Sequence, residues 1–369
     1  MADTYLRKIK ATNFGCLQDV EIEFTPLHAL IGPNDSGKST VLRAVRSLTQ
    51  ALASAARPIG AGVDARDHGL DPEANSALEG QFSFLKFGVR ASPGARFETY
   101  AEYEHGPQQA GTTVGQPHSP GFIPSAPELA QAISGNAVLR DRIVAPASLL
   151  RLDPDALRRE SGLIPESQLV RFYEPGPEGT RGFGLAGVYD ALMNRGDDTF
   201  RAIAKKVREL FPTVRNVRLR AVTRSDKCLE IELTNGKKVG ATEMSEGLLY
   251  YLAFAALPYL AQPSILLVEE PENGLHPARI RDVVGILREV SKTTQVLVAT
   301  HSPLLVNELS GDEVTVVTRD RETGTRARRL STTPDFATRS RVYAMGELWL
   351  SYANGDDEAP LFKSEAKSK

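Results

Sequence analysis

The chain has 369 residues, 41% of them hydrophobic, which is enough for one large domain or two modest domains with a real core. Its 44 Lys and Arg nearly balance its 46 Asp and Glu, which excludes a general polycation that coats nucleic acid but allows a local basic patch. The two cysteines, Cys16 and Cys228, match no metal-ligand spacing, so we expect no disulfide scaffold. The chain has no signal-peptide-like start and no apolar run long enough to span a bilayer, and we therefore predict a cytoplasmic protein without a membrane partner.

The first third of the chain alternates between apolar and polar residues in several places, which is typical of strands. Strands are predicted over residues 5–10, 20–24, 81–89 and 97–103. The first two pair across a turn at 13–16, and the last two form a hairpin around Ser92-Pro93-Gly94. A short buried strand is predicted over 27–31, followed by a helix with apolar residues from Val41 to Leu48.

The remainder of the chain mixes helical and strand patterns. Amphipathic helices are predicted over 185–193, 200–210 and 277–290, an apolar helix over 248–260, and a strand pair over 214–224 and 229–233. Continuous apolar runs at 264–268 and 295–300 predict strands buried on both faces of a parallel sheet. Loops are expected at 51–75, 106–127 and 175–179, with a disordered tail at 354–369.

The strongest motif follows the strand at 27–31 and fits the phosphate-binding pattern G-x-x-x-x-G-K-[ST]. Its residues are Gly32, Pro33, Asn34, Asp35, Ser36, Gly37, Lys38, Ser39 and Thr40. The glycines let backbone amides approach an anion closely, and the helix that follows adds its positive end. Lys38 is expected to reach the β- and γ-phosphates of ATP, and the Ser39 hydroxyl is expected to bind Mg²⁺.

Two further groups lie where the later buried strands end, the edge at which ligands bind in open α/β sheets. Glu269 and Glu270 follow the first of these strands. We predict that Glu269 holds Mg²⁺ and that Glu270 polarises the attacking water. His301 follows the second strand and is predicted to hydrogen-bond the γ-phosphate.

A second anion site is predicted at the start of the apolar helix, where Ser245, Glu246 and Gly247 follow Met244. Glu246 is unfavourable beside an anion, so the site is expected to act from a distance or across an interface. An ordinary helix N-cap fits the same residues.

Taken together, these segments resemble ABC-type ATPases of the SMC/RecF/OLD-like group, in particular its compact AAA-21 branch without a long coiled coil. The residues from Tyr5 to Leu17 resemble the family's opening strand and turn. Residues 32–40 match Walker A, 244–247 the signature loop, 265–270 Walker B, 271–277 the D-loop, and His301 the switch histidine. The segments 151–158 and 182–186 also resemble middle-region segments of this branch.

The resemblance implies a P-loop NTPase with the ABC-ATPase head architecture. This is an α/β fold with a mixed central sheet flanked by helices, an antiparallel β subdomain and a helical signature subdomain. The head would span residues 1–310 with a loop-rich insertion at 51–145, and residues 311–353 would extend it. A Q-loop glutamine is also implied, for which Gln81 and Gln168 are both candidates.

The family further implies ATP and Mg²⁺ as cofactors and a head-to-tail homodimer, in which the Ser245 loop of one subunit contacts ATP on the other. Family members act on DNA, often with a nuclease, in repair or anti-phage defence. Here we expect a separate effector or nuclease chain, because little sequence follows His301. Direct DNA contact would use basic residues at 205–208 and 218–224. The alternatives are an ATPase subunit of a membrane transporter and a low-turnover nucleotide-binding scaffold.

Overall fold

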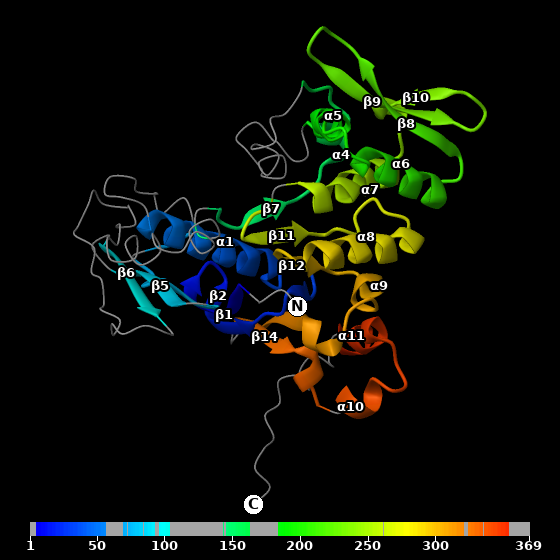
Figure 1. Cartoon of the computed structure of the whole chain (residues 1–369). Coiled ribbons are helices and arrows are strands. Elements are labelled where there is room, and N and C mark those ends of the chain that lie inside the picture. The colour runs from blue at the N-terminus through cyan, green and yellow to red at the C-terminus, as the bar shows by residue number, and fades with distance from the viewer. Residues whose placement is uncertain are drawn as a thin grey trace, which may run out of the picture. The chain divides into compact units, whose positions relative to one another are not determined.

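The computed structural model describes residues 5–56, 69–71, 73–83, 85–92, 96–103, 143, 145–162, 184–260, 262–320, 324–334 and 336–353. The chain divides into two compact units (Figure 1). Unit 1 comprises Met1–Ala147, Pro263–Leu267 and Ser291–Lys369, and unit 2 comprises Ser148–Gln262 and Val268–Val290. The loops predicted at 106–127 and 175–179, the tail at 354–369 and Gln168 lie outside the described residues.

Unit 1 contains an antiparallel sheet with the strand order β2-β1-β4-β5-β6. Its strands are β1 (Leu6–Phe14), β2 (Leu17–Glu23), β4 (Ala77–Phe82), β5 (Leu85–Ser92) and β6 (Arg96–Tyr103). The predicted β1–β2 and β5–β6 pairings are confirmed. The single strand predicted over 81–89 is wrong, because the chain reverses after Phe82 and forms two antiparallel neighbours. Phe82 and Leu85 are both buried, although their odd spacing would put them on opposite faces of one strand.

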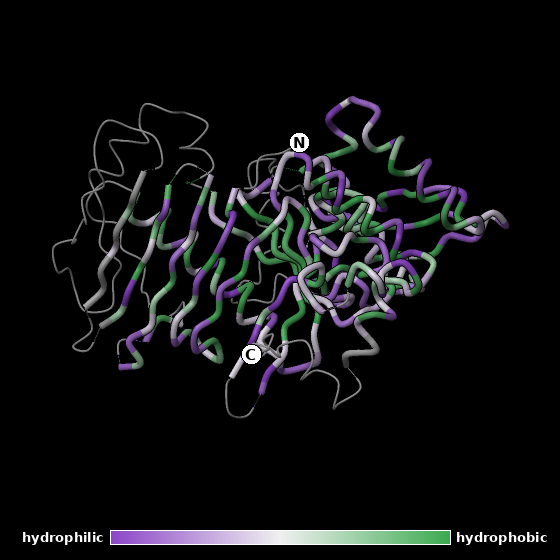
Figure 2. The backbone as a smooth tube through the Cα atoms, turned by 90° about the horizontal axis from the view of Figure 1, so that it is seen from below, coloured by the Kyte–Doolittle hydropathy of each residue, from purple (hydrophilic) through white to green (hydrophobic). Residues whose placement is uncertain are grey.

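The other sheet of unit 1 carries the parallel strands. Along it, the order is β14 (Gly324–Arg329), β13 (Val314–Asp320), β3 (Leu27–Ile31), β12 (Gln295–Thr300) and β11 (Ile265–Glu269), whose last two residues belong to unit 2. Strand β3 pairs in parallel with both β12 and β13. Every residue of β3 and β12 is buried, which confirms the prediction of strands covered on both faces. Hydrophobic stretches gather in the central strands in Figure 2.

Helix α1 (Lys38–Ala55) packs against β12 of the parallel sheet and against β1, β4 and β5 of the antiparallel sheet. Because it is covered by both sheets, it buries polar residues such as Ser47 and Thr49 as well as its apolar stripe. The Thr49 hydroxyl is satisfied there, since it donates to Val45 O and accepts from the Ala147 N–H. The predicted helix is confirmed, and it extends into the region expected to be a loop from residue 51.

The remaining elements of unit 1 follow β12. They are α9 (Pro303–Val306), the 3₁₀ turns Gly311–Glu313 and Leu330–Thr332, α10 (Phe336–Arg339) and α11 (Met345–Ala353). Helix α11 packs against α9, and the Asn307 side chain accepts a 2.7 Å hydrogen bond from the Gly346 N–H. Among the described residues, no helix is both long enough and apolar enough to cross a membrane.

Unit 2 combines helices with a small antiparallel sheet in the order β10-β9-β8. Its elements are β7 (Ser148–Leu150), α4 (Pro154–Leu157), α5 (Leu185–Asn194), α6 (Thr199–Leu210), β8 (Val214–Ala221), β9 (Lys227–Leu233), β10 (Lys238–Gly240), α7 (Glu246–Ala256) and α8 (Pro277–Val290). Helices α5 and α6 pack between the sheet and α7, which also contacts α8. Helices α5, α6 and α8 confirm their predictions. The helix predicted over 248–260 gives way after Ala256 to a 3₁₀ turn, Leu257–Tyr259, where Pro258 lacks an N–H donor.

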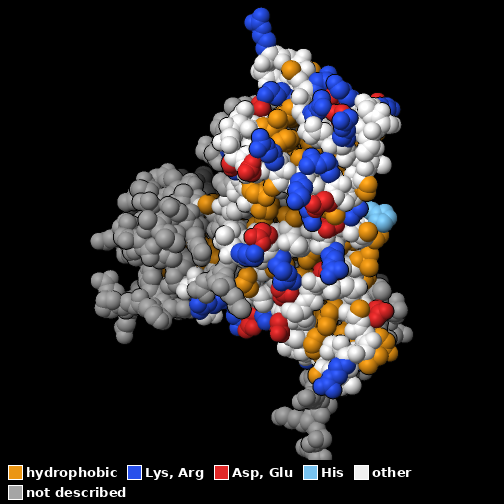
Figure 3. Space-filling model, turned by 45° about the vertical axis from the view of Figure 1, so that its right-hand side comes forward, with side chains coloured by type: hydrophobic (Ala, Val, Ile, Leu, Met, Phe, Trp, Pro, Cys, Tyr) orange, Lys and Arg blue, Asp and Glu red, His pale blue; other side chains and the backbone are white. Residues whose placement is uncertain are grey.

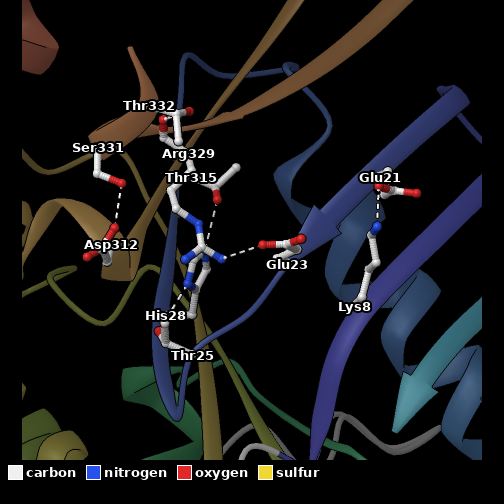
Figure 4. Close-up of polar contacts among 10 residues, drawn as sticks. All are labelled: Lys8, Glu21, Glu23, Thr25, His28, Asp312, Thr315, Arg329, Ser331 and Thr332. Carbon is white, nitrogen blue, oxygen red and sulfur yellow. Dashed lines mark hydrogen bonds and ion pairs between the residues drawn. The ribbon is translucent and has the colours of Figure 1, made fainter. Parts of the chain in front are cut away.

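A buried histidine lies in the central strand β3. His28 is fully buried, with Nδ1 3.1 Å from Thr25 Oγ1 and Nε2 2.9 Å from Thr315 Oγ1 (Figure 4). Because the Thr25 hydroxyl donates to Leu27 O, it accepts from His28 Nδ1–H, and Nε2 accepts from Thr315. Burial, and secondarily the positive charge of Arg329, lower the pKa of His28 to about 3. The folded protein therefore holds a neutral imidazole.

This burial predicts a specific acid sensitivity. The unfolded chain takes up a proton on His28 near pH 6.5, whereas the folded protein does so only near pH 3, so this part of the stability is lost as the pH falls through that window. The loss is about 1.4 kcal/mol per pH unit. Urea unfolding of wild type and His28→Gln between pH 7 and pH 4.5 should show a shallower fall for the variant, whatever its stability at pH 7. Parallel curves would contradict this assignment.

Candidate nucleotide-binding site

The phosphate-binding motif of unit 1 connects β3 to α1, as its pattern predicts. Gly37 precedes the helix with a φ of 107°, a conformation that favours glycine. Lys38 is buried, and its Nζ donates to the carbonyl oxygens of Gly32 at 2.8 Å and Pro33 at 2.7 Å. The ammonium group is thus held against the inside of the loop, where a phosphate would be its natural partner.

Strand β13 packs closely against the loop. A Cβ atom on Gly32 would lie 2.0 Å from the Val317 carbonyl oxygen, so a larger residue cannot be accommodated without moving backbone. Thr325 donates a hydrogen bond to Ser36 O. The Ser36 hydroxyl is buried and has no hydrogen-bond partner among the described residues. An unsatisfied buried hydroxyl beside a buried ammonium group fits a site that an anion completes.

A cavity of about 610 Å³ opens along the loop and has the volume of a small-molecule site. It is lined by Pro33, Asn34, Asp35 and Ser36 of the loop, by Gly15, Cys16 and Gln18 of the β1–β2 turn, and by Arg319, Asp320 and Gly324. Asp35 has a φ of 65°, and its carboxylate lies 3.2 Å from the Arg319 guanidinium.

The two hydroxyls after Lys38 differ in their surroundings. Thr40 is buried, and its Oγ1 has hydrogen bonds from Arg43 at 3.0 Å and from the Cys16 thiol at 3.4 Å. Ser39 is exposed in the first turn of α1. Of the two hydroxyls, that of Ser39 is the more accessible to a ligand.

His301 lies at the same sheet edge as the loop. Parallel pairing puts Thr300 of β12 opposite Ile31 of β3, so His301 and Gly32 leave neighbouring strands at the same level. The side chain of His301 is exposed, while Ser302 caps α9 by accepting from the Leu305 N–H. Within unit 1, the strands thus bring the phosphate loop and the histidine together as the sequence predicts.

In unit 2, the acidic pair ends β11 in two different environments. The Glu269 side chain is 11% exposed, and its Oε2 lies 3.6 Å from Arg151 Nη1. Glu270 has a φ of 46°, unusual for a residue with a Cβ, and its carboxylate accepts a 2.6 Å hydrogen bond from Asn273 Nδ2. Sequence analysis gave no role to Arg151 or Asn273, because neither contact has a signature in the chain order.

The signature residues begin α7 in the same unit. Ser245 is the N-cap residue and Glu246 the first helical residue, and both are exposed. The N-cap interpretation therefore holds for the position of Ser245, although its hydroxyl makes no capping hydrogen bond among the described residues. A Cβ on Gly247 would lie 3.0 Å from Gly274 O, which shows that this loop packs closely on the segment after the acidic pair.

The Q-loop candidates remain open. Gln81 is exposed on β4 of the antiparallel sheet, and Gln168 lies outside the described residues. Among the described residues, no group of three or more His, Cys, Asp and Glu side chains forms a metal site.

Gly274 offers a test of the contact between the signature helix and the acidic-pair segment. Its φ is 70°, and a Cβ would lie 2.3 Å from the Tyr250 ring. Gly236 has a similar φ of 82° with nothing within 4 Å, so both alanine variants share the backbone strain but only Gly274→Ala adds the clash. We expect Gly274→Ala to cost about 1–3 kcal/mol more than Gly236→Ala in urea unfolding. Equal losses would show that Tyr250 moves aside freely.

Comparison with known proteins identifies related domains in two parts of the chain. Residues 140–307 match the family model "AAA domain, putative AbiEii toxin, Type IV TA system". Residues 5–72 match the model "AAA ATPase domain". An OLD nuclease of Thermus scotoductus is 45% identical over 40 residues, which is 11% of this chain and only 8% of that relative.

Solved structures of similar fold are heads of SMC proteins. The SMC head bound to the C-winged helix domain of ScpA has a TM-score of 0.56 at 16% identity, covering 89% of this chain and 99% of that one. The SMC head with an extended coiled coil, bound to the C-terminal domain of ScpA derived from Pyrococcus furiosus, has a TM-score of 0.53 at 14% identity, covering 92% and 100%. These likenesses confirm the predicted α/β head fold. Together with the family matches, they support the resemblance of the chain to SMC/RecF/OLD-like ATPases.

Proposed function

We propose that this protein binds and hydrolyses ATP with Mg²⁺ and uses bound ATP to join two copies of the chain head to tail. The observation that carries the proposal is the phosphate loop, where a buried Lys38 ammonium and an unsatisfied Ser36 hydroxyl lie beside the start of α1. His301 at the same sheet edge supports a site that responds to a γ-phosphate.

The acidic pair supplies the hydrolytic chemistry in this proposal. Ser39 and Glu269 offer the oxygens that Mg²⁺ prefers, Glu269 through water. The metal would neutralise the charge that develops on the phosphates. Glu270 accepts a proton from the attacking water as general base. The hydrogen bond from Asn273 fixes the carboxylate of Glu270 for that task.

The dimer rests on the exposed start of α7. Ser245 and Glu246 face solvent, and the Ser245 hydroxyl is not used as a helix cap among the described residues. In the proposed dimer, the Ser245 hydroxyl and the Gly247 amide bind the γ-phosphate held by the partner subunit's phosphate loop. Lys38 of that loop offsets the negative charge of Glu246.

The ATP-linked switch is proposed to gate a partner effector, with DNA processing as its context. This proposal draws on the OLD nuclease relative and on the SMC heads solved with ScpA domains. Direct DNA binding through β8 is less well supported than a partner effector. Two of its arginines already lie beside carboxylates, since Arg218 pairs with Glu232 and Arg220 lies 3.8 Å from Glu230. Lys, Arg, Asp and Glu side chains are interspersed on the face in Figure 3.

Lys38→Ala should weaken ATP binding by about 100-fold or more, because the phosphates lose a buried charge-assisted hydrogen bond. The measurement is a titration with a fluorescent ATP analogue, with circular dichroism to verify folding. Lys10→Ala is the matched control, since Lys10 is exposed and forms a surface ion pair with Asp19. Full-strength binding by Lys38→Ala would reject the assignment of the loop.

Glu270→Gln should bind ATP but hydrolyse it at least about 100-fold more slowly, because the amide cannot accept the proton from water. It keeps an oxygen for the hydrogen bond from Asn273. Light scattering should therefore find dimers with ATP and monomers with ADP. Glu160→Gln, at an exposed position, is the control for the loss of charge.

The proposed ATP-linked dimer is wrong if Glu270→Gln stays monomeric at saturating ATP. Intact binding with no measurable turnover in the wild type would instead identify a nucleotide-gated scaffold. Turnover that requires a membrane subunit would identify a transporter ATPase.

A further inference from the structure

An arginine lies beside the acid that is proposed to bind Mg²⁺. Arg151 directly follows β7, the neighbour of β11 in the strand order. Its Nη1 is 3.6 Å from Glu269 Oε2. The Arg151 side chain is 55% exposed, whereas that of Glu269 is 11% exposed. The pair therefore joins a cation that is more than half exposed to a carboxylate that is largely shielded from water.

The surroundings of Glu269 explain why it needs a cation. The pair borders a cavity of about 170 Å³ whose walls include Tyr250, Phe254 and Val268. Beside these apolar groups, a carboxylate loses hydration, and an uncompensated charge there is costly. Burial raises the pKa of the neighbouring Tyr250 phenol to about 12, so this group supplies no charge at neutral pH.

Arg151 is the one Lys or Arg among the described residues that line this cavity. Asp153 is the N-cap of α4 and accepts from the Asp155 and Ala156 amides. Glu270 accepts from Asn273. Each of these two acids thus accepts from a neutral donor, while the Arg151 guanidinium lies beside Glu269.

We propose that Arg151 is a positioning residue that occupies the place of the metal charge at Glu269 and competes with Mg²⁺ for this carboxylate. The inference rests on the proposed function of Glu269. A separation of 3.6 Å is too long for a tight bidentate pair, and the exposed arginine has room to leave. Arg151 thereby stabilises the nucleotide-free protein and raises the Mg²⁺ concentration that ATP binding requires.

The test is the Mg²⁺ midpoint of ATP-analogue binding, measured at fixed nucleotide concentration in the Glu270→Gln background to prevent turnover. Arg151→Gln should lower this midpoint by about two- to fivefold, the factor that corresponds to a partly exposed ion pair. Arg151→Lys keeps the charge, and its Mg²⁺ midpoint should lie between those of the parent protein and Arg151→Gln. Arg159→Gln is the matched control, because Arg159 is exposed in the same unit and its loss changes the net charge equally.

A second comparison shows whether the effect passes through Glu269. Without nucleotide and with a chelator present, Arg151→Gln should lower the melting temperature of the wild type but not that of Glu269→Gln. An unchanged or higher Mg²⁺ midpoint in Arg151→Gln would overturn the competition. A fall in melting temperature that persists in Glu269→Gln would also overturn it.

The two proposals fail in different ways. If the wild type binds no nucleotide, the proposed function falls, while the nucleotide-free melting comparison still decides whether Arg151 compensates Glu269. If the wild type binds ATP with Mg²⁺ but Arg151→Gln matches Arg159→Gln, only the inference about Arg151 falls.

Discussion

The parallel pairing of β3 with β12 is the constraint on which the candidate site depends. All residues of both strands are buried. A shift of the pairing register by one residue would therefore not move apolar side chains from a buried face to an exposed one. The side chains on both faces and the ladder of hydrogen bonds together fix the register of Thr300 on Ile31. That register places Gly32 and His301 at one edge, although they are far apart in the sequence.

The same core carries an unusual polar centre. His28 lies in β3 between Thr25 and Thr315, and its two ring nitrogens find one acceptor and one donor. A strand of leucine or valine alone would not need this match. Because the imidazole is satisfied only in one neutral tautomer, it links β3 to β13 through a specific hydrogen bond. Strand β13 in turn supports the phosphate loop through the close approach of Val317 O to Gly32.

Sequence patterns predicted best where burial leaves few choices. The strand at 27–31, the strand at 295–300 and the helix at 277–290 have the predicted bounds, because continuous apolar runs and helical spacing are local signals. The reversal after Phe82 was missed, since apolar residues continue through it and the change of phase at Leu85 was not used. The phosphate loop could be predicted because the residues of its motif are consecutive in the sequence. The contact of Arg151 with Glu269 could not be predicted, because these residues are far apart in the sequence and no motif links them.

Each unit has a candidate-site residue with a strained backbone. Asp35 and Glu270 both have φ values near the left-handed region, which costs of order 1 kcal/mol for residues with a Cβ. Each has a side-chain partner. Asp35 pairs with Arg319, which is distant in the sequence, and Glu270 accepts from Asn273, three residues later. Such strain persists only where neighbouring contacts hold it. The adjacent residues Glu269 and Glu270 have different surroundings. One is shielded and paired with a cation, and the other is held by a neutral amide. Different environments let neighbouring acids differ in proton affinity, as the separate tasks proposed for Glu269 and Glu270 would require.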